Sequence, residues 1–405
     1  MKKIINPYIF FLTIQVTPLL VWFIVPSSIF EISLNYYDKP QFGLNSFLVY
    51  FSFLLAFFLG CKISLLKKRR IAVIKEDDVK PILYLHKITL LLSFVSMLFI
   101  LRFSFDGNLN VIEAILFGET NTLKESVYSR GALEQIIIMG RHLLFTSAIT
   151  WYILKTLKVK IKTLPVIILI GFILFLFTSS RFTLLSIILI VMVFKLQKPL
   201  INFNKVKLFI VVASLFFVFG LGVYFRSRNT WALLTGSDNI IVIAFSEFIG
   251  YFISPINYSV ALIEKQQYFY PKNIISSLFG FIVTALNLNI GPNSYLQNIS
   301  NYYNPSLSAH GLVGLWFTGF GPFLFIPSFL FGYISGKYYK LFINGNLYGM
   351  LFYPLIFISL FDSFRGFMLT QNYIMSNILF IVAFLFLWKI IKKIMIIKLT
   401  IDNTI

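Results

Sequence analysis

Arginine is the residue whose placement in this sequence most directly indicates chemistry. The guanidinium group is a planar, permanently charged fork that binds phosphate through two parallel hydrogen bonds, whereas the lysine ammonium acts as a point charge. Two of the nine arginines, Arg69 and Arg70, stand in a lysine-rich stretch. The other seven lie at the ends of apolar runs, between them or inside one: Arg102, Arg130, Arg141, Arg181, Arg226, Arg228 and Arg365. This placement predicts binding of a phosphate-bearing ligand.

Three of these arginines are the strongest candidates for a diphosphate clamp. Arg181 occupies a very tight turn between two apolar runs. Arg226 and Arg228 directly follow an apolar run and are two positions apart. Residues at that spacing point the same way in an extended segment, so both can hold one diphosphate. The alternatives for Arg181 are contact with lipid phosphates or pairing with a neighbouring carboxylate, and the alternative for the pair is a solvated loop.

Arg365 and Arg141 are weaker candidates for the same clamp. Arg365 follows Asp362 by three residues, and this carboxylate is a ready local ion-pair partner. Arg141 stands inside an apolar run. A lipid-facing arginine there is costly, so we expect Arg141 to face the interior of a helix bundle.

Two titratable residues are candidates for proton transfer. His310 precedes a long apolar run, and the unperturbed pKa of histidine, about 6.5, suits proton transfer at neutral pH. Glu247 stands in an otherwise apolar stretch. A buried carboxylate needs a partner, so Glu247 either pairs with one of the arginines or acts as a base. The alternative for His310 is an interfacial side chain bonded to backbone or to a lipid headgroup.

The segment 226–310 is poor in charge and rich in Tyr and Asn. Tyr offers a flat apolar face with a hydroxyl, and Asn supplies both a donor and an acceptor. That combination suits sugars, and the predicted sugar-binding residues are Tyr295, Asn298, Tyr302 and Tyr303. The alternative is an interfacial aromatic belt with turn-forming asparagines.

The elements that must position these residues are membrane helices. The chain has 405 residues, of which 58% are hydrophobic and 12% charged, against about 25% charged in soluble domains. Its 48 Phe exceed what one soluble core could hide, and it has a single cysteine, Cys61. Composition therefore excludes a soluble enzyme, a disordered protein and a disulfide scaffold.

A helix needs about 20 apolar residues to cross about 30 Å of hydrocarbon. Ten runs meet this need: 7–25, 45–66, 82–101, 133–154, 163–178, 182–197, 208–225, 311–335, 347–364 and 370–390. Two weaker runs, 240–262 and 274–290, are interpreted as further spans, re-entrant segments or interfacial helices. The prediction is an all-α polytopic integral membrane protein with about 10–12 transmembrane helices and one large outer loop. Residues 1–225 form a first block of about seven helices, 226–310 the loop, and 311–405 a C-terminal block of about three.

The net charge of +20 predicts how these helices are oriented. With Lys2 and Lys3 in the cytoplasm, 23 of the 35 basic residues fall in cytoplasmic segments, as the positive-inside rule requires. Both termini are then cytoplasmic, and the first run is a signal anchor that stays in the protein. The seven arginines fall on the other side, or within a span.

Motifs for soluble cofactors are missing from the sequence. It contains no GxxxxGK[ST] loop and no Rossmann glycine fingerprint, and its one Cys and three His have no metal-ligand spacing. We therefore expect no cofactor, no metal and no nucleic acid partner.

Short motifs along the chain resemble those of Wzy-type oligosaccharide repeat-unit polymerases, which make O-antigen and capsule. The turn Ser180-Arg181 lies between two central spans, and the late loop is followed by His310-Gly311-Leu312-Val313-Gly314. Gly319-Phe320-Gly321-Pro322 and Phe331-Gly332-Tyr333-Ile334-Ser335-Gly336 come next. The Arg-to-Gly spacing of eleven found in some members is not met after Arg130 or Arg226.

This resemblance implies a glycosyltransferase in the bacterial cytoplasmic membrane. It would join undecaprenyl-diphosphate-linked oligosaccharides at the outer face, with the lipid diphosphate as leaving group. The partners implied are that lipid-linked oligosaccharide, the bilayer, a chain-length-regulating membrane protein and a flippase. Two alternatives stay open: an O-antigen ligase-like enzyme with the same chemistry, and a flippase or transporter of the lipid-linked sugar.

Overall fold

In a computed structural model, every regular element of the described chain is helical. The described residues are 5–27, 38–67, 74, 76–105, 111, 127, 132–178, 181–197, 232, 236–237, 239–270, 273–275, 278–279, 282, 299, 302 and 311–402. No strand occurs among them, which confirms the all-α prediction. The helices, with 3-10 turns marked η, are α1 (Pro7–Ile24), α3 (Leu44–Leu66), η1 (Glu76–Asp78), α4 (Val79–Phe105), α7 (Ala132–Met139), η2 (Gly140–Leu143), α8 (Leu144–Thr156), α9 (Leu164–Thr178), α10 (Arg181–Gln197), α12 (Ile240–Glu264), α14 (Leu312–Phe320), η5 (Gly321–Leu324), α15 (Phe325–Ile343), α16 (Leu347–Phe361), η6 (Asp362–Phe364), η7 (Met368–Thr370) and α17 (Asn372–Asp402).

Eight helical segments of the described chain are long and apolar enough to cross a membrane. Six are α1, α3, α4, α12, α16 with η6, and α17; in the other two, a 3-10 turn joins α7 to α8 and α14 to α15. The helices α9 and α10 are also apolar but shorter, at 15 and 17 residues. The chain is thus built as a multi-pass membrane protein.

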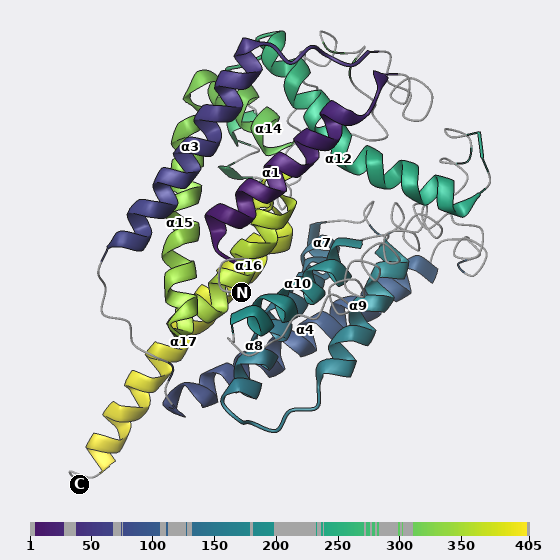
Figure 1. Ribbon diagram of the computed structural model, residues 1–405. Helices are drawn as coiled ribbons and strands as arrows, with labels where there is room; N and C mark the ends of the chain where they lie inside the picture. Colours follow the sequence, from purple (N-terminus) through teal and green to yellow (C-terminus); the bar gives the residue numbers. More distant parts are fainter. Residues whose placement is uncertain are drawn as a thin grey trace.

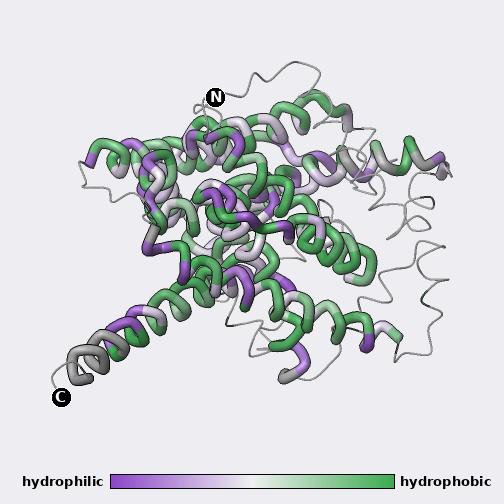
Figure 2. The backbone as a smooth tube through the Cα atoms, turned by 90° about the horizontal axis from the view of Figure 1, so that it is seen from below, coloured by the Kyte–Doolittle hydropathy of each residue, from purple (hydrophilic) through white to green (hydrophobic). Residues whose placement is uncertain are grey.

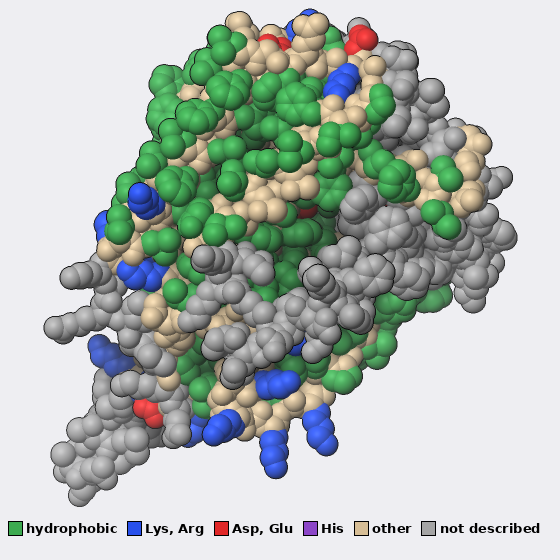
Figure 3. All heavy atoms as spheres, viewed as in Figure 1, with side chains coloured by type: hydrophobic (Ala, Val, Ile, Leu, Met, Phe, Trp, Pro, Cys, Tyr) green, Lys and Arg blue, Asp and Glu red, His purple; other side chains and the backbone are tan. Residues whose placement is uncertain are grey.

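The surface of the molecule is apolar, as a bilayer requires. Large side chains such as Leu44, Leu91 and Phe386 are exposed by 60% or more, and soluble proteins rarely expose contiguous apolar patches of this kind. Green dominates the helices in Figure 2, and Figure 3 shows apolar side chains covering much of one face.

Nine of the ten predicted runs coincide with helices, and the tenth, 208–225, lies outside the described residues. The weaker run 240–262 forms α12, a helix of 25 residues whose N-cap, Asn239, accepts a hydrogen bond from the Ile241 N–H at 2.9 Å. The run 274–290 lies mostly outside the described residues. The described part of the segment 226–310 therefore contains one helix of membrane-crossing length, α12.

Two groups of helices share α16 (Figure 1). One apolar core joins residues of α4, α8, α9, α10 and α17, and the other joins residues of α1, α3, α12, α14 and α15. The helix α16 contributes to both, for example through Phe357 to the first and Leu360 to the second. This position explains why 83% of the α16 span is buried, whereas only 17% of the α17 span is.

The two ends of this bundle differ in charge. At one end Lys340 donates to the carbonyl groups of Leu65 and Lys67 at 2.7 Å each, just past the end of α3. Blue Lys and Arg side chains gather along the lower edge in Figure 3. We call this the lysine-rich end. The helix α16 starts near it at Leu347 and ends at Phe361, so Asp362 lies about 22 Å further along the helix axis.

Candidate functional site

The polar site lies where α16 gives way to the turn η6. Two backbone N–H groups, of Arg365 and Gly366, donate to the Asp362 carbonyl at 2.9 and 3.1 Å and close the turn. The turn places the Asp362 and Arg365 side chains on one side. Asp362 is fully buried, whereas the Arg365 side chain is 32% exposed. The carboxylate is therefore fixed inside the protein, and the guanidinium reaches toward its surface.

Tyr251 of α12 lies between these two charged groups. Arg365 Nη1 donates to the Tyr251 hydroxyl at 2.7 Å, and that hydroxyl donates to Asp362 Oδ1 at 3.2 Å. The guanidinium carbon also lies 3.9 Å from the centre of the Tyr251 ring. The direct ion pair between Arg365 Nη1 and Asp362 Oδ1 is longer, at 3.9 Å. The phenol thus connects cation and carboxylate through a short chain of hydrogen bonds.

Glu247 stands one helical turn before Tyr251 on α12, with a residue exposure of 6%. Burial by itself would lower the pKa of Arg365, but Tyr251, Asp362 and Glu247 more than offset burial, and the pKa is raised. The guanidinium therefore stays charged. We refer to Glu247, Tyr251, Asp362 and Arg365 as the Arg365 cluster.

The negative charges next to Arg365 limit its ability to bind a diphosphate by itself. Asp362 lies near the guanidinium and Glu247 adds a second negative charge, so an added diphosphate would meet opposing negative charge. Asp362 is the local partner predicted from the sequence, and the ion pair between it and Arg365 is present. Among the described residues, Arg365 Nε and Asp362 Oδ2 have no hydrogen-bond partner. Both atoms are buried, so only the exposed part of the guanidinium can meet a ligand.

Gly311 connects the beginning of α14 to this cluster. Its N–H donates to the Arg365 carbonyl at 2.8 Å, and its φ is +63°, a conformation that favours glycine. A Cβ at this position would lie 2.7 Å from Ser259 Oγ and 3.0 Å from the Pro255 carbonyl oxygen. Gly311, the residue after His310, therefore packs closely against α12 and Arg365. His310 itself lies outside the described residues.

Pro255 explains how α12 can present both Tyr251 and Ser259 to this site. A proline inside a helix has no N–H to donate four residues back, which leaves the Tyr251 carbonyl without its helical partner. Ser259 Oγ donates to the Pro255 carbonyl at 2.7 Å and accepts from the Gly314 N–H at 3.1 Å. This serine joins α12 to α14, and Figure 1 shows α12 changing direction along its length.

Polar side chains of α1 extend the site through the apolar core. Gln15 Nε2 donates to Ser363 Oγ at 2.8 Å, and Trp22 Nε1 donates to Asn257 Oδ1 at 3.1 Å. Gln15, Asn257 and Ser363 are all buried. Neither Gln15, Tyr251 nor Asn257 was predicted to have a role. A single polar residue inside an apolar run was the signal that could have identified Gln15 and Asn257.

Arg141 lies in a different part of the bundle. It belongs to η2 and is buried, as predicted, and its Nε donates to His142 Nε2 at 3.3 Å. The His142 ring lies 4.5 Å from that of Tyr373 in α17, and the His142 carbonyl accepts from Asn377 Nδ2 at 2.9 Å. His142 thereby ties η2 to α17, whereas Arg365 contacts Tyr251 of α12.

Arg181 is the first residue of α10, and only two residues separate it from Thr178, where α9 ends. At the other end of α10, Gln197 donates to the Phe342 carbonyl at 2.6 Å, near the lysine-rich end. Sixteen residues of helix span about 24 Å. The backbone of Arg181 therefore lies toward the same end of the bundle as Arg365; its side chain is outside the description.

The remaining predicted residues divide into one that is described and five that are not. Tyr302 is half-buried, packs against the small core around Tyr258 and Leu262, and accepts a hydrogen bond from Asn257 through its carbonyl at 3.2 Å. Arg226, Arg228, Tyr295, Asn298 and Tyr303 lie outside the described residues. Their roles stay predictions.

Neither a search for metal-binding groups nor a comparison with known proteins assigns a further role to these residues. In the described ranges, no group of three or more His, Cys, Asp or Glu could hold a metal ion. Comparison with protein-family models, curated proteins and solved structures finds no match for this chain.

Proposed function

We propose that this chain is a membrane glycosyltransferase that joins lipid-diphosphate-linked oligosaccharide repeat units into a surface polysaccharide, as Wzy-type polymerases do. One observation carries the proposal: Gly311, the residue after His310, is hydrogen-bonded to Arg365 beside Tyr251 and Asp362. The glycine-spaced motif that resembles the polymerases and the Arg365 cluster thus meet in one place. No nucleotide is needed, because the lipid diphosphate already carries the activated sugar bond.

The charge of the two bundle ends supports an outer-face site. The helix α16 runs from the lysine-rich end to Arg365, so one end of this helix carries lysines and the other the polar cluster. The positive-inside rule assigns the lysine-rich end to the cytoplasm. We infer a bacterial cytoplasmic membrane with both termini inside and the Arg365 cluster at the outer face.

The proposed reaction is a displacement at the anomeric carbon of the donor glycan. The acceptor hydroxyl oxygen forms the new glycosidic bond, and the bond from the anomeric carbon to the lipid diphosphate breaks. The electron pair goes to the departing diphosphate oxygen, and the hydroxyl proton goes to His310 or Glu247 as base. Cationic groups stabilise the charge that develops on the leaving group.

The arginines would divide this work. Because the negative charges of Asp362 and Glu247 already act on Arg365, we assign the main diphosphate contacts to Arg181, Arg226 and Arg228. Arg365 donates from its remaining N–H groups and positions the chain at residue 311. Tyr295, Asn298, Tyr302 and Tyr303 are the proposed sugar contacts.

Deletion of the gene in its host, followed by gel analysis of surface polysaccharide, tests this function. A polymerase deletion leaves single repeat units with no long chains, and a plasmid copy restores the ladder. Polymer that is made on the lipid but never reaches its final acceptor would indicate a ligase instead. Loss of all surface glycan, with the lipid-linked unit trapped at the cytoplasmic face, would show a flippase and contradict the proposal.

A further inference from the structure

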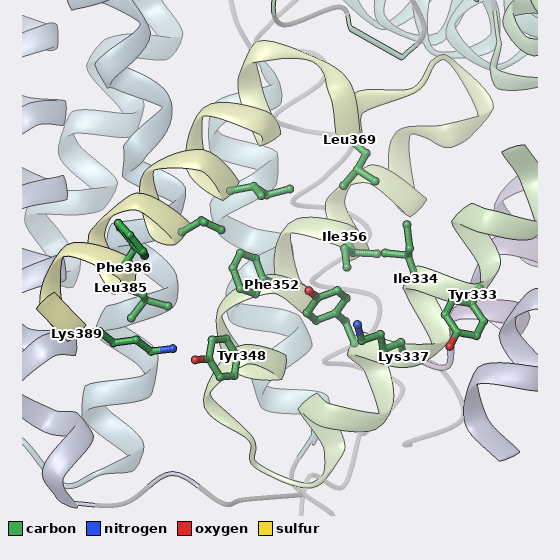
Figure 4. Close-up of a pocket in the computed structure, with 13 residues that line it drawn as sticks. Tyr333, Ile334, Lys337, Tyr348, Phe352, Ile356, Leu369, Leu385, Phe386 and Lys389 are labelled. Carbon is green, nitrogen blue, oxygen red and sulfur yellow. The ribbon is translucent and has the colours of Figure 1, made fainter. Parts of the chain in front are cut away.

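A groove of about 600 Å³ lies between α15, α16 and α17 (Figure 4). Its apolar wall is formed by Phe352 and Ile356 of α16, Val382 and Phe386 of α17, and Leu369 of η7. The volume falls in the range of about 300–1,000 Å³ that small-molecule sites occupy. This groove is separate from the Arg365 cluster, because none of the four cluster residues lines it.

One end of the groove is basic. Figure 4 shows Lys389 of α17 and Tyr348 of α16 reaching toward one another, with Lys337 of α15 across the groove. No carboxylate of the described chain lies within 4.0 Å of either ammonium group. Lys337 lies over an aromatic face, with Nζ 5.5 Å from the centre of the Tyr338 ring. Two cations therefore stand at one apolar groove.

The depth of these lysines matches a membrane interface. Lys389 follows the first residue of α17, Asn372, by 17 positions, which is about 25 Å of helix and close to the thickness of about 30 Å of the hydrocarbon core. Trp388 and the exposed Tyr84, with ring centres 5.6 Å apart, lie at the same level. Trp and Tyr are enriched where helices leave the hydrocarbon.

The groove is open to the bilayer along α17. Val382 and Phe386 line it, yet they are 51% and 64% exposed, so a lipid chain can enter sideways without any helix moving. An occupant that arrives this way needs an apolar tail, and its polar end must suit two lysines and a phenol. The charge pattern therefore selects a lipid with a negative headgroup.

We propose that this groove binds an anionic glycerophospholipid. One acyl chain lies along Phe352, Ile356 and Phe386, and the headgroup phosphate lies between Lys337 and Lys389. The Tyr348 hydroxyl donates a hydrogen bond to a phosphate oxygen. Basic pockets between transmembrane helices bind anionic headgroups by the same physics.

Native mass spectrometry of the full-length protein in detergent, titrated with phosphatidylglycerol or phosphatidylcholine, tests this site. We expect the wild type to retain phosphatidylglycerol in preference to phosphatidylcholine. In the double variant Lys337→Gln/Lys389→Gln, affinity for phosphatidylglycerol should fall roughly tenfold to thirtyfold. The matched control Lys80→Gln/Lys160→Gln removes two exposed lysines outside the groove and should bind as the wild type does.

A second variant separates the contribution of the apolar wall to lipid binding from that of the two lysines. Val382→Trp fills the apolar wall without removing a lysine, and it should weaken both lipids while the protein still elutes as a folded species. Equal retention of the two lipids by the wild type would overturn the proposal, as would unchanged binding in both groove variants. A second protein chain as the occupant would also overturn it, and it would appear as protein–protein crosslinks from a Val382→Cys variant without lipid preference.

Discussion

At the scale of the residue, Arg365 shows how one side chain can be both paired and available. Its Nη1 is engaged by the Tyr251 hydroxyl and lies near Asp362, and its flat face stacks on the phenol ring. A third of the side chain stays exposed, and Nε has no partner among the described residues. The paired part of the guanidinium fixes its orientation, so that the remaining donors are held in place for a ligand.

Substitution of Arg365 is expected to remove chain extension while the protein stays in the membrane. Arg365→Ala loses both the charge and the stacking, and we expect polymer synthesis to fall about a hundredfold, the usual effect of removing one donor that stabilises developing negative charge. Arg365→Lys restores little, because an ammonium can neither stack nor form the fork. The measurement is the polysaccharide ladder, with immunoblots of the membrane fraction.

The control for this series is Lys265→Ala, which removes an exposed basic side chain just past α12 and should leave the ladder intact. Tyr251→Phe keeps the ring but breaks the hydrogen-bond chain to Asp362, and an intermediate loss is expected. Wild-type polymer from Arg365→Ala would show that the cluster is structural only.

Gly311 gives a prediction about stability at the same scale. Gly311→Ala places a Cβ against Ser259 and the Pro255 carbonyl at a positive φ, and it should destabilise the protein by about 1–3 kcal/mol. The readout is a lower Tm of the detergent-purified protein. Gly366→Ala is the control, because a Cβ there meets nothing within 4 Å. Equal Tm values for the two variants would show that Gly311 tolerates a side chain.

At the scale of the element, the closest helix pair is α3 with α15. Gly60 on α3 faces the backbone of Phe329, and Gly332 on α15 faces the backbone of Phe57, so the two helices meet main chain to main chain. Cys61 adds a hydrogen bond from Sγ to the Gly332 carbonyl at 3.1 Å. Small residues allow this approach, and dispersion contacts between helices replace the hydrophobic effect inside a membrane.

A methyl group at this contact should separate the two helices. Gly60→Ala places a Cβ into the Phe329 carbonyl, and we expect a cost of about 1–3 kcal/mol, as for other overpacked interiors. It should lower the Tm and make the buried Cys61 reactive toward maleimide. Leu59→Ala, at the exposed neighbouring position, is the control. If Cys61 stays as protected in Gly60→Ala as in Leu59→Ala, the close packing is not required.

At the scale of the whole molecule, the two helix groups around α16 give the protein two chemically different ends. Lysines collect at one end, where α3 and α15 finish, and the Arg365 cluster follows the other end of α16. Glu264, at the end of α12, accepts hydrogen bonds from the N–H groups of Gly43 and Ser46 at 3.0 Å each and so caps the start of α3. That contact holds α12 and the start of α3 at the end opposite the lysines.

This arrangement predicts which loops face outward. In intact cells, a membrane-impermeant maleimide should label a cysteine at Lys265→Cys, just past α12, and not one at Lys160→Cys, between α8 and α9, because lysine-rich loops stay in the cytoplasm. Permeabilised cells should show labelling of both. The single native cysteine, Cys61, is buried and provides the unlabelled background. Labelling of Lys160→Cys alone in intact cells would reverse the orientation.

The sequence by itself determined the helical class and the position of most spans. Run length and hydropathy are local properties, and a chain in a bilayer must satisfy its backbone within each helix. Local spacing also predicted the ion pair of Asp362 with Arg365 and the tight turn before Arg181. It left α12 open, because Glu247 and Pro255 interrupt the apolar pattern of that run.

Only the tertiary structure decided which polar residues meet. Gln15 bonds to Ser363 across 348 residues of chain, and Tyr251 bonds to Asp362 across 111. No local pattern encodes such pairs, since they depend on how helices pack around α16. The same packing placed His142 against α17 and Arg365 against α12. The physical reason is that helix formation depends on neighbours in the sequence, whereas a binding site depends on neighbours in space.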